Sequence, residues 1–334
     1  MMNALLSIGE GFYRILLNGI YLAYRTGLFR TRQLPVPVVS VGNLTWGGTG
    51  KPPMVMHLAK GSEQMGRHVA VLTRGYGGDE ARLMAQRLDP IPVVVGPDRV
   101  ASGWKAVQEH HADLLLLDDG YQQWRLKKDV EILMLDAEAP FGNGRLIPRG
   151  TLREPARAVA RADVIVIKRT TLSPEKDHEA ETALRRLNPD AAIFCARYRP
   201  VSLTQWPSEN KVALKSLDET LVATVAGIAR PEQFERMVSG LGADVALKYR
   251  VRDHHPYSAR ELAEWFTHCQ QQGIHHVVTT PKDAVRIPKK LAETFETTLK
   301  EMELLVLDVE LELEPDEGEL LHRIHSLLAD PRAE

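Results

Sequence analysis

Residues 36–58 read VPVVSVGNLTWGGTGKPPMVMHL, a pattern that predicts a strand, a glycine-rich turn and a helix. Glycines let the backbone curl tightly so that successive N–H groups aim at one point, and the N-terminus of the following helix adds its positive dipole end. Lys51 adds a point charge. The stretch therefore predicts a phosphate-binding loop, whose contacts we expect from Thr45, Gly47, Gly48, Thr49, Gly50, Lys51 and Pro52.

This loop departs from a Walker phosphate loop at two positions. The Walker motif places a glycine where this chain has Thr45, and a serine or threonine where it has Pro52. Proline fits the first turn of a helix, but it supplies no oxygen for Mg²⁺. A dinucleotide-binding loop is the rival interpretation, but its third glycine would fall at Pro53 and the next strand runs into Thr73 and Arg74 instead of an acid. A glycine-rich turn without a ligand is the remaining alternative.

The composition is typical of a globular protein, with 334 residues, 44% apolar and 26% charged. This length allows one large or two ordinary domains. The formal net charge of -2 gives no overall attraction to nucleic acid, so we expect no nucleic-acid partner. The two cysteines, Cys195 and Cys269, fit neither a metal spacing nor a disulfide framework, which indicates a reducing cytoplasm.

The first residues predict an amphipathic helix. Apolar residues recur every three or four positions, and charged residues interrupt the run before it is long enough to span a bilayer. Arginines follow at positions 25, 30 and 32. An apolar face with nearby arginines suits a helix that lies in a membrane interface, and it equally suits a helix packed on the domain. The apolar positions are Leu5, Ile8, Phe12, Ile15, Leu16, Gly19, Ile20 and Ala23.

Strand and helix patterns alternate after the loop, which predicts the α/β class with a doubly wound, mostly parallel sheet. We expect strands at 68–73, 92–95, 113–118, 130–136, 163–168, 221–228, 245–249, 276–279 and 304–309, and helices that include 53–65, 80–88, 99–110, 258–272 and 317–328. The pattern breaks near Arg199-Pro200 and Trp206-Pro207. The expected segments are an N-terminal helix in 1–34, a phosphate-loop domain in 35–198, a linker in 199–216 and a smaller α/β domain in 217–334, whose last helix packs on the first domain.

Polar residues at strand ends are candidate site residues, because ligands of open α/β sheets bind beyond the carboxyl ends of the strands. Asp118 and Asp119 follow an apolar run, which is typical of a Walker B strand whose acid helps to hold Mg²⁺, although an ordinary Asp-Gly turn gives the same pattern. Asp79 follows a glycine-rich turn. It is a candidate proton acceptor, but its spacing favours a cap for a helix that begins at Glu80.

Two later segments carry further candidates. Arg153 and Glu154 lie in a loop that would neutralise a transferring phosphoryl group or orient metal-bound water, and surface solvation is the alternative. His254 follows Asp253, and an imidazole near a carboxylate can tune its proton affinity, although a simple turn before a helix is the alternative. Residues 279–283, TTPKD, form a polar cluster with the same ambiguity.

Taken in order, these motifs resemble the tetraacyldisaccharide 4'-kinase family of lipid A biosynthesis. The resemblance rests on Gly42-Asn43, Gly47 to Lys51, Arg74-Gly75-Tyr76, Gly78-Asp79-Glu80, Asp118-Asp119-Gly120, Leu152-Arg153-Glu154-Pro155, Asp253-His254 and Thr279-Thr280-Pro281-Lys282-Asp283, and it runs from the N-terminal helix almost to the C-terminus.

The resemblance implies an ATP- and Mg²⁺-dependent kinase that phosphorylates the 4'-hydroxyl of a tetraacylated glucosamine disaccharide 1-phosphate. It implies that Lys51 holds the ATP phosphates, that Asp118, Asp119 and Glu154 serve Mg²⁺, and that Arg153 contacts the phosphate site. Asp79, with His254, becomes the catalytic base instead of a helix cap. A monomer bound peripherally to the cytoplasmic face of the bacterial inner membrane, through its N-terminal helix, is the implied cellular form.

The chain differs from the usual family pattern in two places. Pro52 stands where members usually carry threonine, and the hairpin usually inserted between Arg-Gly-Tyr and Gly-Asp-Glu is missing. One alternative is therefore a catalytically weakened nucleotide- or lipid-binding protein of the same fold. Another is a kinase for a soluble small molecule on the same scaffold.

Overall fold

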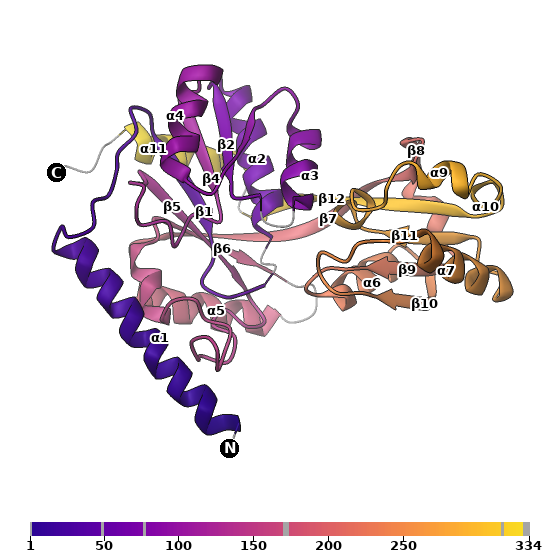
Figure 1. The fold of residues 1–334 in the computed structure, drawn as a ribbon, viewed down its shortest axis with the longest axis horizontal. Coiled ribbons are helices and arrows are strands. Elements are labelled where there is room, and N and C mark those ends of the chain that lie inside the picture. Colours follow the sequence, from indigo (N-terminus) through magenta and orange to yellow (C-terminus); the bar gives the residue numbers. More distant parts are fainter. Residues whose placement is uncertain (1, 48–49, 76–77, 170–173, 315–316, 330–334) are drawn as a thin grey trace. The chain divides into compact units, whose positions relative to one another are not determined.

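The computed structural model describes residues 2–47, 50–75, 78–169, 174–314 and 317–329 (Figure 1). Its contacts divide the chain into two units. Unit 1 comprises Met1–Gly75, Met84–Arg197 and Leu311–Glu334, and unit 2 comprises Tyr76–Leu83 and Tyr198–Glu310. Two long strands, β7 and β12, have residues in both units.

The elements of unit 1, with the strand and helix that continue into unit 2, are α1 (Met2–Arg25), β1 (Val38–Gly42), α2 (Lys51–Gln64), β2 (Val69–Thr73), α3 (Asp79–Leu88), β3 (Val93–Val95), α4 (Arg99–His110), β4 (Leu114–Asp118), β5 (Val130–Asp136), η1 (Ala156–Arg161), β6 (Val164–Lys168), α5 (Pro174–Leu187), β7 (Ala192–Trp206) and α11 (Glu317–Ala329). The remaining elements are β8 (Asn210–Val212), η2 (Leu214–Leu217), β9 (Leu221–Ala226), α6 (Pro231–Ser239), β10 (Asp244–Arg250), α7 (Ala259–Gln271), β11 (His276–Thr279), α8 (Pro281–Ala284), α9 (Leu291–Thr294), α10 (Thr298–Glu301) and β12 (Glu303–Glu314).

Unit 1 is built on a sheet with the strand order β7-β6-β5-β1-β4-β2-β3. Each neighbouring pair in it is parallel. The strands are apolar on both faces because helices cover both. Leu115 and Leu117 of β4 cluster with Ala106 of α4, whereas the alternate side chains of the strand point to the face that α2 contacts. This arrangement confirms the predicted doubly wound α/β fold.

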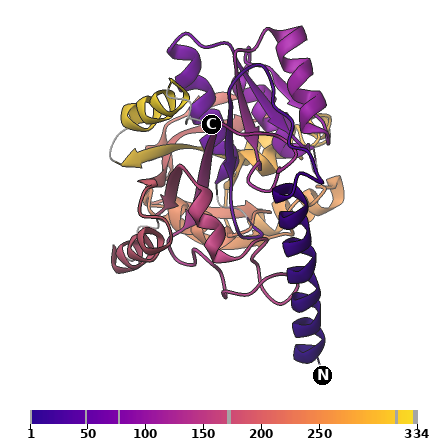
Figure 2. The same cartoon turned by 90° about the vertical axis from the view of Figure 1, so that its left-hand side faces the viewer.

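Helix α1 belongs to unit 1 and projects beyond the sheet of that unit, with its N-terminus at the far end (Figures 1 and 2). One face of the helix packs: Leu17 and Ala23 are buried, and Tyr13 and Tyr21 pack against a core cluster of the unit. The other face exposes large apolar side chains. In the described part of the chain, no helix combines the length and the apolar character needed to cross a membrane.

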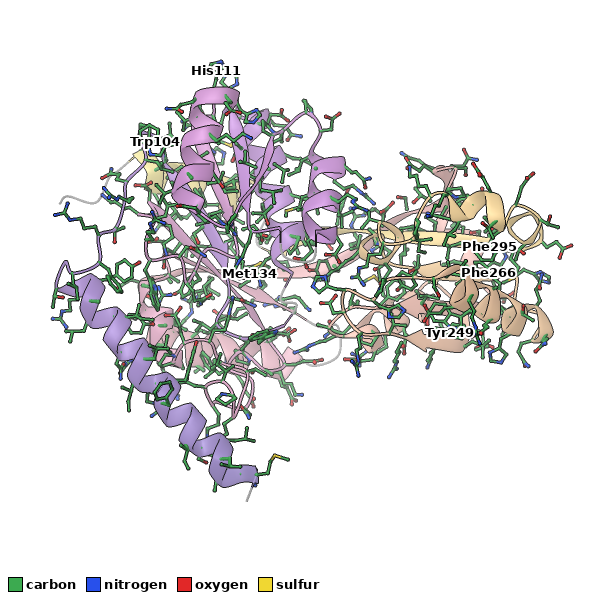
Figure 3. All side chains as sticks on the ribbon, in the orientation of Figure 1. Trp104, His111, Met134, Tyr249, Phe266 and Phe295 are labelled. Atoms are coloured by element: carbon green, nitrogen blue, oxygen red, sulfur yellow. The ribbon has the colours of Figure 1, made fainter. Side chains whose placement is uncertain are left out.

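Unit 2 has its own sheet, in which β10, β9, β11 and β12 pair in parallel in that order. Its core lies between this sheet and α7, where Phe266 meets Phe295 edge-on with ring centroids 5.4 Å apart (Figure 3). Both rings are almost fully buried. The four core clusters each lie within one unit, so each unit buries a core of its own.

The structure corrects the expected linker at 199–216. This stretch contains the second half of β7, then β8 and η2, and β8 pairs antiparallel with β7 from Leu203 to Gln205. Its prolines are compatible with this arrangement because an edge strand tolerates a missing N–H. The predicted strand at 304–309 is likewise longer, since β12 runs over Glu303–Glu314. The last helix, α11, contacts α2 of unit 1.

Candidate active site

The phosphate loop joins β1 to α2 in unit 1. Gly42 ends β1 against Tyr121, where an added Cβ would lie 2.6 Å from the Tyr121 nitrogen, so only glycine fits. Gly50 adopts a left-handed φ of 89° directly before α2, which glycine permits at low cost. Helix α2 begins at Lys51 and not at Pro53, so Pro52 lies in its first turn, where a missing N–H costs nothing. Gly48 and Thr49 lie outside the described residues.

Lys51 and Arg153 converge on one carboxylate. Lys51 Nζ lies 3.4 Å from Asp119 Oδ1, and the Arg153 guanidinium donates to both Asp119 oxygens at 3.0 and 2.9 Å. Arg153 also donates to the Asn43 carbonyl oxygen at 2.9 Å. Burial by itself would raise the pKa of Asp119, but the charges of Lys51 and Arg153 outweigh burial and hold this pKa below its usual range. The Asp119 side chain is therefore an ionised acid beside the phosphate loop.

Asp118 ends β4 next to Asp119 and is buried. Its Oδ2 accepts a hydrogen bond of 3.0 Å from the hydroxyl of Thr73, which ends the neighbouring strand β2. The two acids differ in exposure, because the chain turns at Asp119 with a left-handed φ of 52°. Neighbouring parallel strands thus bring their polar ends together at one edge of the sheet, as the sequence predicts for Asp118, Asp119 and Lys51.

Glu154 is placed differently from the sequence expectation of a metal site. Its side chain is fully buried, and both oxygens are engaged. Arg161 donates to them at 2.6 and 2.8 Å, Gln122 donates at 2.7 Å, and the Tyr21 hydroxyl of α1 donates to Oε2. A carboxylate with this many donors and no exposure is an anchor for its loop and not an available metal ligand. Sequence alone could not reveal this burial.

A second cluster forms within unit 2 around Asp79, the first residue of α3. Asp79 is buried, and His254 Nδ1 lies 2.9 and 3.0 Å from its two oxygens. An ionised carboxylate accepts hydrogen bonds, so this contact places the proton of a neutral His254 on Nδ1. The imidazole Nε2 lies 3.9 Å from Asp253 Oδ2. The structure therefore brings together Asp79 and His254, which the sequence resemblance pairs.

Arg286 completes this cluster, and the sequence reasoning missed it. Its Nε donates to Asp79 Oδ2 at 2.7 Å, and its terminal nitrogens donate to Asp253 and Asp283 at 3.2 Å each. Lys282 lies 3.0 Å from Asp253 and 2.7 Å from Glu80. The helical spacing of Asp283 and Arg286 was the available signal, because residues three apart on a helix are neighbours.

The cations around Asp79 decide its ionisation. Burial alone would raise the pKa of Asp79, but the charges of Lys282 and Arg286, with the Arg286 hydrogen bond, outweigh burial and hold it below its usual range. Asp79, Asp253 and His254 offer ligand atoms within 4.8 Å of one another. Because Arg286 and Lys282 already neutralise these acids, the cluster is better suited to proton transfer than to a metal ion.

A glycine-rich loop before a helix, a lysine at the first helical position, and an acid at the end of the neighbouring strand are the parts of a P-loop enzyme that acts on nucleoside triphosphates. The class defined by this fold and site is therefore a P-loop phosphotransferase.

Comparison with known proteins gives the particular family. The family model described as LpxK, Tetraacyldisaccharide-1-P 4'-kinase, matches residues 2–329. The tetraacyldisaccharide 4'-kinase of Anaeromyxobacter dehalogenans is 38% identical over 80% of this chain and 77% of its own, and that of Geobacter sulfurreducens is 34% identical over 92% and 91%. A crystal structure of LpxK from Aquifex aeolicus in complex with ATP covers 98% of this chain and all of its own, with a TM-score of 0.75 and 27% identity. The chain belongs to the tetraacyldisaccharide-1-P 4'-kinase family, which confirms the resemblance seen in the sequence.

Proposed function

We propose that this chain transfers the γ-phosphoryl group of ATP to the 4'-hydroxyl of a tetraacylated glucosamine disaccharide 1-phosphate, in lipid A biosynthesis. The observation that carries the proposal is that the family match runs over nearly the whole chain while both polar clusters are assembled around the expected residues. Neither the weakened binding protein nor the soluble small-molecule kinase has support among the comparisons.

On the phosphate side, we assign Lys51 and Arg153 to the ATP phosphates. In the structure both cations pair with Asp119. ATP phosphates would take over these partners, and the two charges would then spread the negative charge that develops during transfer. Thr45, Gly47 and Gly50 would shape the loop, as would Gly48 and Thr49.

Asp118 and Asp119 fit the Mg²⁺ that family kinases use with ATP. Carboxylate oxygens are the ligands that this ion prefers, and both acids stand at the strand end beside the phosphate loop. When bound, the ion would neutralise phosphate charge. With Pro52 in place of a hydroxyl residue, the two acids and water supply its oxygens. Asp118 is already oriented for this task by the Thr73 hydroxyl.

On the acceptor side, we assign Asp79 as the base that takes the proton of the 4'-hydroxyl. His254 and Arg286 hold the carboxylate in one orientation through the hydrogen bonds described above. Both oxygens of Asp79 have partners, so the base acts in the reacting complex after His254 moves or releases one of them.

We also propose that α1 docks on the cytoplasmic face of the inner membrane, where the acylated substrate resides. Its outward face carries Ile8, Phe12 and Ile15, each more than two-thirds exposed at 71, 71 and 72%. Arginines follow at positions 25, 30 and 32 and suit an anionic lipid surface. The enzyme would then be a peripheral, monomeric membrane protein.

The decisive experiment measures transfer of labelled γ-phosphate from ATP to the detergent-dispersed disaccharide lipid, with and without Mg²⁺. The native chain should form labelled lipid only with Mg²⁺. Lys51→Ala should lose ATP binding and product, whereas Asp79→Asn should keep ATP binding and lose product. ATP binding without labelled lipid in the native chain would contradict the proposed function. Unchanged turnover of Asp79→Asn would remove Asp79 from the base role.

A further inference from the structure

Helix α1 is joined to the phosphate site by its inward face. Three polar residues of the helix reach a single segment, residues 146–154, which we call the bridging segment. The Tyr13 hydroxyl donates to the Arg153 carbonyl oxygen at 2.8 Å, and the Tyr21 hydroxyl donates to Glu154. Glu10, almost fully buried, accepts from the Leu146 nitrogen at 3.4 Å. The helix therefore holds both ends of the bridging segment.

The bridging segment in turn holds the phosphate loop. The Trp46 nitrogen donates to the Thr151 carbonyl oxygen at 2.6 Å, and the Arg153 nitrogen donates to the Leu44 carbonyl oxygen at 2.7 Å. Thr45 and Leu152 form an antiparallel bridge between these hydrogen bonds. The Arg153 side chain continues from the same segment to Asp119. A displacement of the bridging segment would thus move the phosphate loop and the arginine together.

The two faces of α1 are chemically distinct. Toward the bridging segment the helix presents hydroxyls and a carboxylate, whereas its outward face is apolar and unpartnered among the described residues. A helix that only had to pack on its domain would bury its apolar face. A helix that only had to anchor the protein would need no hydrogen bonds to the site.

We propose that α1 couples the lipid surface to the nucleotide site, with Tyr13 and Tyr21 as the positioning residues that transmit the coupling. This inference rests on the proposed function in one respect, the docking of α1 on lipid. Docking restrains α1, the tyrosine hydroxyls pass the restraint to the bridging segment, and the phosphate loop pays less ordering entropy when ATP binds. Because coupling between two binding sites is reciprocal, ATP would also tighten the grip on lipid.

The test measures the dissociation constant of ATP, with Mg²⁺, in the absence and presence of vesicles of phosphatidylethanolamine and phosphatidylglycerol that contain no substrate. For the native chain we expect vesicles to tighten ATP binding by about fivefold or more, the lower range of measured coupling between sites. The double variant Tyr13→Phe/Tyr21→Phe should still sediment with vesicles, because its outward face is intact, but the vesicle effect on ATP should fall below about twofold.

Tyr24→Phe is the matched control. Tyr24 lies on the same helix and its ring contacts Trp124, with centroids 6.0 Å apart. Among the residues that the structure describes, its hydroxyl has no hydrogen-bond partner. This variant should keep the full vesicle effect. If the double variant proves too unstable to purify, Tyr13→Phe alone, which removes one hydrogen bond to a carbonyl, should halve the effect or more.

Two results would overturn the coupling: an ATP affinity that does not respond to bound vesicles in the native chain, or a double variant that keeps the whole response. Failure of the native chain to bind vesicles would also overturn it, by removing the docking step. Failure of the kinase proposal is seen separately, as absence of labelled lipid in the transfer assay while the vesicle effect on ATP persists.

Discussion

Arg286 contacts Asp79, Asp253 and Asp283 with a side chain that is only 6% exposed. It therefore controls the acid to which we assign proton abstraction, although it lies outside the motifs that point to the site. The residue-scale consequence concerns pH. A base whose pKa is held low stays ionised at neutral pH but has little affinity for a proton, so the surrounding cations set a compromise between availability and strength.

Replacing Arg286 by Gln should move the acid limb of the kcat/KM profile to higher pH by about one unit or more. The loss of a positive charge that lowers the pKa of Asp79 lets this pKa rise, so more of the base is protonated at a given acidic pH. The pH profile of lipid phosphorylation measures the shift. Arg260→Gln, which alters an exposed guanidinium paired with Glu264, is the control and should leave the profile unchanged. An unshifted acid limb in Arg286→Gln would remove Arg286 from this role.

The same pKa has a stability consequence of defined sign. Because the folded-state pKa of Asp79 lies below its ordinary value, the stabilisation is present above about pH 4 and is lost as the pH falls through the folded-state value. Arg286→Gln should therefore lower the free energy of unfolding by about 3–5 kcal/mol at neutral pH, since it leaves buried acids unpaired. The deficit should shrink in acid. Denaturant titrations at two pH values measure it.

Glu154 and Asp118 should separate as anchor and metal ligand. Glu154→Gln leaves Arg161 without its ionised partner and should cost about 3–5 kcal/mol of stability, with no change in the Mg²⁺ concentration that gives half-maximal activity. Asp118→Asn should raise that Mg²⁺ concentration at least tenfold with a smaller loss of stability. Thermal unfolding and Mg²⁺ titrations of activity check both. A raised Mg²⁺ requirement in Glu154→Gln would restore it as a metal ligand.

Pro52→Thr tests the position at which the phosphate loop departs from its family. A hydroxyl there adds an oxygen ligand or a hydrogen bond worth about 1 kcal/mol, so the half-saturating Mg²⁺ concentration should fall about fivefold. Pro53→Thr, one position further along the same helical turn, is the control and should not change it. An unchanged Mg²⁺ requirement in Pro52→Thr would mean that the two acids and water already complete the coordination.

At the scale of elements, apolar periodicity predicted most of the fold. The helix Arg99–His110 and the strands Val130–Asp136 and His276–Thr279 have the predicted bounds, because buried parallel strands are continuous apolar runs. The second half of β7 could not be predicted, since a half-exposed strand with Arg199 and Pro200 reads as a loop. Glu154 shows the same limit at the site, because its burial depends on contacts with distant residues.

The two faces of α1 should respond differently to substitution. The triple variant Ile8→Ser/Phe12→Ser/Ile15→Ser removes outward apolar area that would insert into lipid, at about 1.5–3 kcal/mol per fully buried side chain. Vesicle binding should therefore fall more than tenfold while the melting temperature stays unchanged. Leu17→Ala, on the inward face, should instead destabilise the protein by about 2–5 kcal/mol. Vesicle sedimentation and thermal unfolding distinguish the two effects, and equal vesicle binding by the triple variant would exclude docking through this face.

At the scale of the whole molecule, the chain builds two separate cores and crosses between them through β7 and β12. Such an architecture places the phosphate-loop cluster in one unit and Asp79 with His254 in the other. Each half of the proposed chemistry thus depends on the stability of a different core. Unfolding of such a chain need not be two-state, because multi-domain proteins commonly unfold in separate steps.

Phe266→Ala and Met134→Ala, whose wild-type side chains are labelled in Figure 3, form a matched pair for this separation. Each removes a large buried side chain, from the core of unit 2 and from β5 of unit 1 respectively, at a cost of about 2–5 kcal/mol. In calorimetry, each variant should lower a different transition. Only the transition lowered by Met134→Ala should rise with ATP, because the phosphate loop belongs to unit 1 and a ligand stabilises the state that binds it. A single transition that both substitutions lower equally would mean that β7 and β12 join the two cores into one cooperative unit.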